Sequence, residues 1–228
     1  MSERLPQRLT LEDAYDPPVS PWLDIIYQDK DLVVLNKPAG LLSTPGRDPS
    51  RFDSALLRVR DALGWAELVH RLDAATSGVL VLALRRKAEV ALKRQFQERQ
   101  TQKRYVARVL GCVVEDEGQI NLPLFPDFDH KPLQKVCEVH GKPARTDFRV
   151  LERAQDSTLL ELIPVTGRSH QLRVHLMAVG HPILGDRFYG ISGASEAADR
   201  LLLHARDLVF QHPYDGREMT FEVPPPFE

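Results

Sequence analysis

The chain has only two cysteines in 228 residues, Cys112 and Cys137, and it has no long apolar run. Two cysteines without a CxxC pair give no disulfide framework, which is typical of proteins from a reducing compartment. The longest apolar run, residues 79–84, is far shorter than the roughly 20 residues that a membrane helix needs. No basic segment followed by an apolar stretch opens the sequence, so no secretory signal is expected. We therefore expect a cytoplasmic protein without a membrane partner.

The sequence also lacks a metal-binding pattern. His170 and His175 are five positions apart, one more than the i, i+4 spacing that places two histidine ligands on one face of a helix. Neither cysteine lies beside a histidine at the spacing of metal ligands. We expect no bound metal.

Charge is unevenly distributed along the chain. Apolar residues make up 43% and charged residues 27%, a composition typical of globular proteins, and the net charge is −2. Residues 1–31 contain three Lys or Arg and seven Asp or Glu, whereas residues 85–108 contain nine and two. The basic segment is either a solvated helix or a surface that binds along the phosphates of a nucleic acid. The excess of Arg over Lys, 22 to 8, suits contacts with phosphates and bases.

Apolar patterns predict more strands than helices. Alternating or continuous apolar stretches indicate strands at residues 23–27, 32–35, 79–84, 105–110, 146–151 and 159–163. Helices are indicated at residues 53–63, 85–100 and 169–179, the first capped by Asp53 or Ser54 and the last by Ser169. Residues 201–210 and 219–223 are strands or short helices. Strands in hairpin-like pairs predict an α+β fold on a mixed, mostly antiparallel sheet flanked by helices and loops.

The first residues differ from the rest of the chain. They contain Pro6, Pro17 and Pro18 and show little periodicity. We interpret residues 1–21 as a loosely attached N-terminal arm. Because no linker is visible after it, residues 22–228 are expected to form a single domain.

Three segments carry more polar residues than a structural role demands: residues 70–78 (HRLDAATSG), 103–109 (KRYVARV) and 166–175 (TGRSHQLRVH). Each also has a structural interpretation: a turn around Asp73, an ordinary strand that packs Tyr105, and a capped helix start. Arg168 does not suit the last of these, because a cation is unfavourable near the positive end of a helix. An anion is therefore expected nearby, either a protein carboxylate or a phosphate.

Taken together, the segments resemble the pseudouridine synthases of the RluA group. The resemblance rests on His-Arg-Leu-Asp followed by Thr-Ser-Gly, on Lys-x-Tyr-x-Ala-x-Val, and on Gly-Arg-Ser-His-Gln-Leu-Arg-x-His. Further similar stretches are residues 36–40 (NKPAG), 181–186 (HPILGD) and 202–205 (LLHA), and all six occur in the family's order. The chain has no room for the S4-type RNA-binding domain of many members, so it is similar to the short form of the family.

The resemblance implies a catalytic domain that converts uridine in RNA into its C5-linked isomer without a cofactor. Asp73 matches the catalytic aspartate, which either attacks the sugar carbon or removes a sugar proton. Both routes need an ionised carboxylate, and because desolvation would neutralise it, a partner cation is required. Arg168 matches that partner, and Tyr105 matches the tyrosine that stacks on the uracil and helps to remove the C5 proton. The family also flips the target base into an RNA-binding cleft across the sheet.

Further substrate-binding positions follow from the same resemblance. Leu172 matches an apolar residue that lines the pocket, and Arg71 matches the arginine that fills the space left by the flipped base. His70 and Thr76, in the same motif as Asp73, are also assigned to substrate binding. We expect phosphate contacts from four residues of the basic segment, namely Lys93, Arg94, Arg99 and Lys103.

The implied substrates are a hairpin loop of 23S ribosomal RNA, a transfer-RNA anticodon stem-loop, or both. No DNA partner is expected, and the expected state is a monomer. Two alternatives stay open: a non-catalytic RNA-binding module and an aspartate-dependent hydrolase of N-glycosidic bonds. A hydrolase needs a second carboxylate, about 5–10 Å from the first, and Glu67 is the only acidic residue close upstream of Asp73. A binding module does not need Asp73, Tyr105 and Arg168 together.

Overall fold

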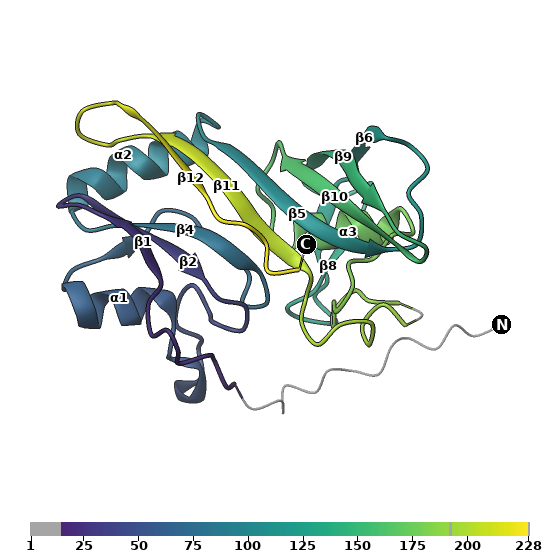
Figure 1. Ribbon diagram of the computed structural model, residues 1–228, viewed down its shortest axis with the longest axis horizontal. Coiled ribbons are helices and arrows are strands. Elements are labelled where there is room, and N and C mark those ends of the chain that lie inside the picture. The colour runs from purple at the N-terminus through teal and green to yellow at the C-terminus, as the bar shows by residue number, and fades with distance from the viewer. Residues whose placement is uncertain (1–14, 192, 228) are drawn as a thin grey trace. The chain divides into compact units, whose positions relative to one another are not determined.

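The computed structural model describes residues 15–191 and 193–227, which form two compact units (Figure 1). The Asp73 unit consists of Asp16–Val106 with residues 203–227, and the Arg168 unit consists mainly of Ala107–Leu202. The chain passes between the units inside a strand and again just before another strand, so neither junction has the composition of a linker.

Most of the predicted N-terminal arm, residues 1–14, lies outside the described residues. The end of the arm is attached to the Asp73 unit by Arg58. The guanidinium of Arg58 donates hydrogen bonds to the carbonyls of Pro18 and Trp22, at 2.8 and 3.0 Å, and lies over the Trp22 ring. No helix within the described residues is long and apolar enough to cross a bilayer.

The Asp73 unit is built on a mixed sheet with the strand order β1–β2–β4–β11. Its strands are β1 (Ile25–Gln28), β2 (Leu32–Lys37), β3 (Glu67–Leu68), β4 (Ser77–Ala83), β11 (Leu203–Gln211) and β12 (Glu218–Glu222). Strand β4 pairs in parallel with β11, whereas β1 with β2, β2 with β4, β3 with β4 and β11 with β12 pair antiparallel. The predicted mixed, mostly antiparallel sheet is confirmed, and the two C-terminal segments are strands.

Strand β4 is the centre of this unit, because all of its residues are buried. Successive side chains, such as Val81 and Leu82, belong to two different apolar clusters. The first cluster contains residues of α2 (Arg86–Gln97), and the second contains residues of α1 (Ala55–Leu63). The two helices therefore cover opposite faces of β4 (Figure 1), which explains why the strand is apolar on both faces.

Helix α1 begins and ends as its sequence predicts. The Ser54 hydroxyl accepts the N–H of Leu57 at 3.4 Å and caps the first turn. Gly64 ends the helix with a φ of 83°, a conformation that other residues rarely adopt. Local capping chemistry therefore sets both ends of α1.

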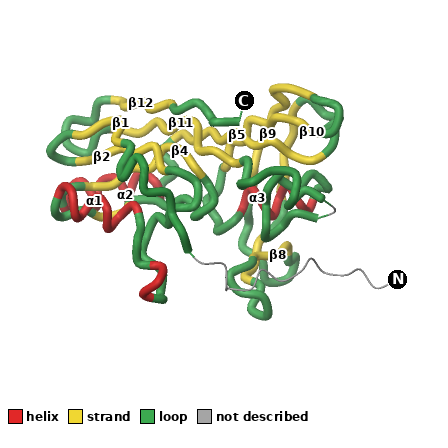
Figure 2. Tube along the Cα trace, turned by 60° about the horizontal axis from the view of Figure 1, so that its bottom comes forward, coloured by secondary structure: helices red, strands yellow, loops and turns green. Residues whose placement is uncertain are grey.

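The Arg168 unit contains antiparallel strands in the order β10–β9–β6, and a separate β7–β8 hairpin. Its elements are β6 (Glu117–Asn121), β7 (Leu124–Pro126), β8 (Gln134–Val136), β9 (Arg145–Arg153), β10 (Ser157–Pro164) and α3 (Gln171–Ala178). Strand β5 (Gln102–Leu110) belongs to the Asp73 unit up to Val106 and to the Arg168 unit after it. Strands and loops dominate both units (Figure 2).

Helix α3 begins two residues later than predicted. Instead of Ser169, the N-cap is His170, which has a φ of 54° and makes no capping hydrogen bond with its side chain. This left-handed residue interrupts the helical backbone, and the sequence pattern does not reveal it. Arg168 therefore lies on a turn before the helix. At the other end of α3, Gly180 has a φ of 87° and follows the last turn.

Candidate active site

Asp73 lies on a tight turn that leads into β4. Its carbonyl accepts the N–H of Thr76 at 3.1 Å, which closes the turn. Leu72 and Thr76 are buried, Asp73 is partly exposed and Arg71 is exposed. The turn thus presents a carboxylate and a guanidinium at the edge of a packed segment.

A buried lysine holds the backbone after Asp73. The Nζ of Lys37, which is only 1% exposed, donates hydrogen bonds to the carbonyls of Leu41 at 2.7 Å, Pro38 at 2.8 Å and Ala74 at 3.1 Å. Three acceptors match the three donors of an ammonium group and offset the free-energy cost of burying its charge. Lys37 therefore fixes the residue that follows Asp73.

A buried serine holds the backbone before Asp73. The hydroxyl of Ser43 donates to the Leu72 carbonyl at 2.7 Å and accepts the Leu72 N–H at 3.1 Å. One side chain thus satisfies both backbone polar groups of a buried residue. Since both neighbours of Asp73 are anchored, the backbone that carries its carboxylate has little freedom.

The far end of the turn packs directly against β11. Gly78 has a φ of 114°, and a Cβ there would lie 2.2 Å from the carbonyl oxygen of Ala205. Beside it, the Ser77 hydroxyl lies 2.8 Å from Nδ1 of His204, whose Nε2 lies 3.0 Å from the Val223 carbonyl. Because a carbonyl only accepts, Nε2 carries the proton and Nδ1 accepts from Ser77.

Tyr105 lies on the part of β5 that belongs to the Asp73 unit, and packs against the apolar cluster that includes Leu72 and Leu80. Burial raises the pKa of its phenol, and the negative charge of Asp73 raises the pKa further. Both effects disfavour the phenolate, so Tyr105 is a neutral phenol. The influence of Asp73 also places these two predicted catalytic residues near each other.

His70 is a neutral residue that supports the sheet. Its Nε2 accepts the N–H of Val81 at 3.1 Å, and its ring stacks on Phe96 with centroids 4.5 Å apart. Burial, and to a smaller extent the charge of Lys103, lowers the pKa of His70 to about 3. The proton therefore lies on Nδ1, and the ring carries no positive charge for a phosphate.

Arg168 lies on an exposed turn that Gln171 holds in place. The Oε1 of Gln171 accepts the Thr166 hydroxyl at 2.7 Å and the Arg168 N–H at 3.1 Å, and its Nε2 donates to the Arg145 carbonyl at 2.9 Å. The Arg168 guanidinium donates from Nε to the Pro143 carbonyl at 3.3 Å. The buried amide therefore ties the backbone of Arg168 to β9.

Helix α3 is anchored by a buried ion pair. Arg173 and Asp186 form two hydrogen bonds, at 2.7 and 2.8 Å, and both side chains are almost completely buried. At the N-cap, Nδ1 of His170 lies 2.6 Å from the Tyr189 hydroxyl. Leu172, the predicted pocket residue, is 7% exposed on this helix. The Arg168 turn thus leads directly into helix α3, which the Arg173–Asp186 ion pair holds in place.

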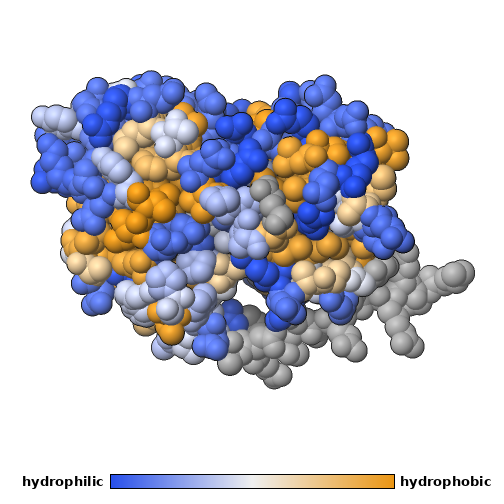
Figure 3. Space-filling model, viewed as in Figure 1, coloured by the Kyte–Doolittle hydropathy of each residue, from blue (hydrophilic) through white to orange (hydrophobic). Residues whose placement is uncertain are grey.

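The predicted phosphate contacts lie in and after α2; at the upper left of Figure 3, where Figure 1 labels this helix, hydrophilic atoms surround a pale orange patch. Two of the four pair with glutamates of the same helix: Lys93 with Glu89 at 2.6 Å, and Arg94 with Glu98 at 2.8 Å. Burial, together with the charge of Arg99, lowers the pKa of Lys103. Arg99 is exposed. Part of the positive charge counted in the sequence is therefore already neutralised on the helix.

The structure brings Asp73 and Tyr105 together in one unit, and it places Arg168 and Leu172 on adjoining segments of the other. The predicted ion pair between Asp73 and Arg168 stays a prediction. Sequence analysis missed the residues that hold the two turns: Lys37, Ser43, His204 and Gln171. Three of them lie in the stretches NKPAG, LLHA and HQLR, so the sequence contained a signal for all but the serine.

None of the predicted catalytic residues belongs to a cluster with the spacing of metal ligands. In the part of the chain that the structure describes, such a cluster is formed by Asp29, Asp31 and His212. It lies between the β1–β2 turn and the end of β11, and it shares no residue with the Asp73 turn.

Comparisons with known proteins agree with one another. Residues 31–178 match the family model described as RNA pseudouridylate synthase. The chain is 54% identical over 216 residues to the dual-specificity RNA pseudouridine synthase RluA of Escherichia coli K12, covering 94% of this chain and 99% of that protein. It is 49% identical to the protein of the same name from Pasteurella multocida, covering 94% and 98%. The solved structure of human RNA pseudouridylate synthase domain containing 1 is similar with a TM-score of 0.76 at 30% identity, covering 90% of this chain and 84% of the other.

Proposed function

We propose a substrate range and a set of catalytic roles for this chain, which belongs to the RNA pseudouridylate synthase family and is an RNA pseudouridine synthase. The substrates are a hairpin loop of 23S ribosomal RNA and the anticodon stem-loop of transfer RNA. The similar bacterial proteins are named dual-specificity enzymes, which supports two kinds of RNA substrate. The enzyme breaks the N-glycosidic bond of a uridine, turns the uracil and joins C5 to the same sugar carbon.

The observation that carries the catalytic assignment is the Asp73 turn. Its backbone is anchored on both sides by buried groups, and a neutral phenol lies near its carboxylate. A fixed, partly exposed carboxylate can act at the sugar, either as the nucleophile or as the base that removes a sugar proton. Tyr105 stacks on the uracil through its ring. Because Tyr105 is a neutral phenol, it must lose its own hydroxyl proton before its oxygen can accept the proton that C5 of the uracil gives up.

Arg168 is the proposed partner that keeps Asp73 ionised when RNA excludes water from the site. A carboxylate in a desolvated pocket takes up a proton unless a cation stabilises its charge. The Arg168 turn suits this role because Gln171 fixes its backbone while the side chain stays exposed. Exposure leaves the guanidinium accessible to an anion.

The remaining substrate-binding roles follow the surroundings of each side chain. Exposed Arg71 enters the space that the flipped uridine leaves, and Leu172 provides an apolar wall for the base. His70 and Thr76 act by shaping the turn, because one is neutral and the other is buried. Arg99 is the strongest candidate for a phosphate contact, because it is exposed and pairs with no glutamate among the described residues. Lys93, Arg94 and Lys103 are weaker candidates.

We further propose that the enzyme works in the cytoplasm as a monomer and without a cofactor. The isomerisation involves no net oxidation or hydrolysis, so it needs no external electron or water. Both cysteines are free thiols, in agreement with a reducing compartment.

Replacing the carboxylate tests the proposed chemistry. Asp73→Asn keeps the size of the side chain but removes its charge, so pseudouridine formation should fall to background in both RNA classes while RNA affinity is kept. Arg168→Ala should lower turnover more than about tenfold, because it removes the cation from a desolvated carboxylate. Chemical mapping of pseudouridine in 23S and transfer RNA is the measurement, and Asp61→Asn, an exposed aspartate of the same unit, is the control.

The same assay can contradict either role. Substantial product from Asp73→Asn would remove Asp73 from the catalytic role, and normal turnover of Arg168→Ala would remove the ion pair.

A further inference from the structure

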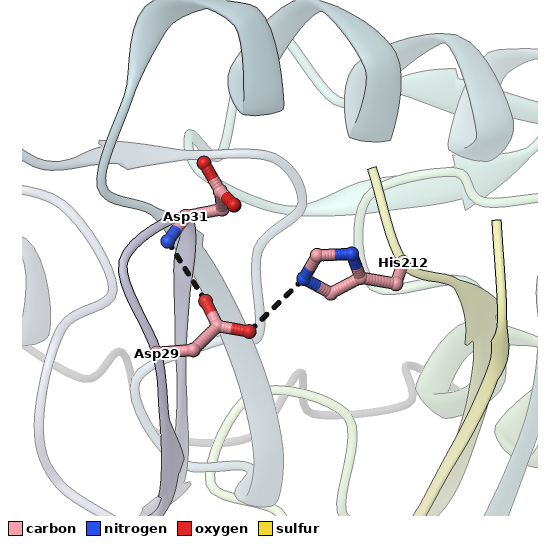
Figure 4. Close-up of side chains that lie close together, drawn as sticks. All are labelled: Asp29, Asp31 and His212. Atoms are coloured by element: carbon pink, nitrogen blue, oxygen red, sulfur yellow. Dashed lines mark hydrogen bonds and ion pairs between the residues drawn. The ribbon is translucent and has the colours of Figure 1, made fainter. Parts of the chain in front are cut away.

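Asp29, Asp31 and His212 form a compact cluster in the Asp73 unit (Figure 4). The two aspartates lie in the turn between β1 and β2, and His212 follows the last residue of β11. One oxygen of each carboxylate and one ring nitrogen of His212 all lie within 4.8 Å of one another. The histidine is 183 positions from Asp29, so the sequence shows no motif here.

The Asp31 carboxylate is the unusual member of the cluster. Asp31 is only 6% exposed, and its buried Oδ2 has no hydrogen-bond partner among the described residues. Its backbone, in contrast, is satisfied: the N–H donates to Asp29 Oδ1 and the carbonyl accepts from Leu84, both at 2.8 Å. A buried carboxylate without a donor is costly, and a cation is the ligand that would offset this cost.

Asp29 is an anion held in a fixed orientation. Its Oδ1 accepts the N–H groups of Asp31 and Leu32, and its Oδ2 accepts the Tyr27 hydroxyl at 2.8 Å and lies 3.0 Å from His212 Nε2. These hydrogen bonds favour the ionised form of the carboxyl group and fix both of its oxygens. Asp29 therefore brings an oriented anion to the cluster.

His212 lies between two aspartates. Its Nε2 is 3.0 Å from Oδ2 of Asp29, and its Nδ1 is 3.1 Å from Oδ1 of Asp215. The N–H groups of Tyr214 and Asp215 donate to Nδ1, at 3.3 and 3.4 Å, so in the metal-free protein Nδ1 is the acceptor and the Nε2 proton points to Asp29. A metal at Nε2 would replace that proton. The ring proton would then move to Nδ1, where the Asp215 carboxylate is within reach as its acceptor.

The charges around the cluster favour an added cation. Three carboxylates face the site region, those of Asp29, Asp31 and Asp215. Two side-chain cations lie close by, but each has another contact: Lys30 lies over the Tyr214 ring, and Arg217 donates to the Tyr27 hydroxyl and lies 3.6 Å from Asp215.

We propose that Asp29, Asp31 and His212 bind a divalent metal ion of the zinc class. Imidazole suits zinc and its neighbours, and two carboxylates neutralise its charge. Ligand atoms of a tetrahedral zinc ion lie about 3.4 Å apart, so the Asp31 side chain has to move closer to Asp29 and His212 when the metal binds. The ion would tie the β1–β2 turn to the end of β11. It has no part in the isomerisation, so activity should be insensitive to its removal.

Zinc chloride titrated into the full chain by calorimetry tests the site. We expect one equivalent to bind. Asp31→Asn and His212→Gln should each weaken binding at least about tenfold, because even the loss of a residue that only supports a metal ligand lowers metal affinity by about that much. Asp127→Asn is the matched control, because Asp127 pairs with exposed His130 at 3.0 Å but has no second carboxylate in a cluster. Unchanged zinc affinity in both cluster variants would overturn the proposal.

Cobalt chloride provides a readout on the wild-type chain, which does not depend on any variant folding. Oxygen and nitrogen ligands give weak d–d bands, whereas binding to Cys112 or Cys137 gives an intense thiolate charge-transfer band. The first result supports the site, and the second alone would assign binding to the cysteines and overturn it. With chelator present, Asp31→Asn should be no less heat-stable than wild type, and zinc should raise the melting temperature of wild type only. Because pseudouridine formation is measured separately, a failure here leaves the proposed function intact.

Discussion

The Asp73 turn and the Arg168 turn both present a charged side chain on a short loop, but their backbones are held in different ways. The neighbours of Asp73 are anchored by Lys37 and Ser43, which lie 37 and 29 positions from the residues they bind. The Arg168 N–H is anchored by Gln171, only three positions later. The backbone around Asp73 is therefore held by distant residues, one of which is a buried charge, whereas the Arg168 N–H is held by a neutral amide of the adjoining helix that is itself bonded to β9.

The largest difference should appear when each anchor loses its polar group. Lys37→Met leaves the carbonyls of Leu41 and Pro38 without the lysine donor, while the Ala74 carbonyl keeps only the N–H of Gly40, and it should lower the free energy of unfolding by about 3–5 kcal/mol. Gln171→Met breaks neutral hydrogen bonds and should cost about 2 kcal/mol. Urea unfolding followed by circular dichroism measures both.

Lys87→Met, at an exposed position of α2, is the control for the lysine change and should be near wild type. Both anchor variants should also turn over RNA more slowly, because each displaces a charged side chain of the site. Equal losses of stability in the two variants would contradict the difference between buried-charge and amide anchoring.

A pair of glycines sharpens the same comparison. Gly78→Ala would place a Cβ 2.2 Å from the Ala205 oxygen at a positive φ, and should cost about 3 kcal/mol or more and slow turnover. At Gly167, next to Arg168, a Cβ meets nothing within 4 Å, and Gly167→Ala should change stability by less than about 0.5 kcal/mol. Melting curves and single-turnover rates measure these effects. A tolerated Gly78→Ala would show that the Asp73 turn is looser than its packing indicates.

The smallest expected effect concerns pH and the Asp73 unit alone. The pKa of His70 is lowered from 6.5 to about 3, so between these values the unfolded chain binds a proton that the folded chain does not. Stability therefore falls as the pH falls from about 6.5, and by pH 5 His70 accounts for about 1–2 kcal/mol of this loss.

His70→Gln keeps an acceptor for the Val81 N–H but cannot titrate. Between pH 7 and pH 5, the wild type should lose about 1–2 kcal/mol more stability than this variant in urea unfolding. His140→Gln, at an exposed position, should leave the pH dependence unchanged. If His70→Gln had the full pH dependence of the wild type, His70 would have to take up its proton in the folded state.

Features governed by neighbouring residues could be predicted from the sequence. The strands β1, β2 and β4 and the Ser54 cap of α1 depend on patterns within about ten residues, and all of them are confirmed. The start of α3 was wrong because the left-handed backbone of His170 is stabilised by contacts outside the helix, including the Tyr189 hydroxyl.

Features that join distant residues could not be predicted in this way. A lysine such as Lys37 is normally exposed, and only the three carbonyls that surround it make its burial possible. The catalytic candidates Asp73 and Tyr105 came from the family resemblance, since no local rule links an aspartate in a turn to a tyrosine 32 positions later in a strand. The two-unit organisation was also invisible, because one junction lies within β5.

The burial of Lys37 has a practical consequence for covalent labelling. Amine-reactive acetylating reagents modify accessible, deprotonated lysines, and the Lys37 amine is enclosed with all its protons engaged. Its acetylation rate, read by mass spectrometry against exposed Lys87, therefore reports how often the loop around the Asp73 carboxylate opens. Slower labelling in the presence of RNA would measure how far substrate closes that loop.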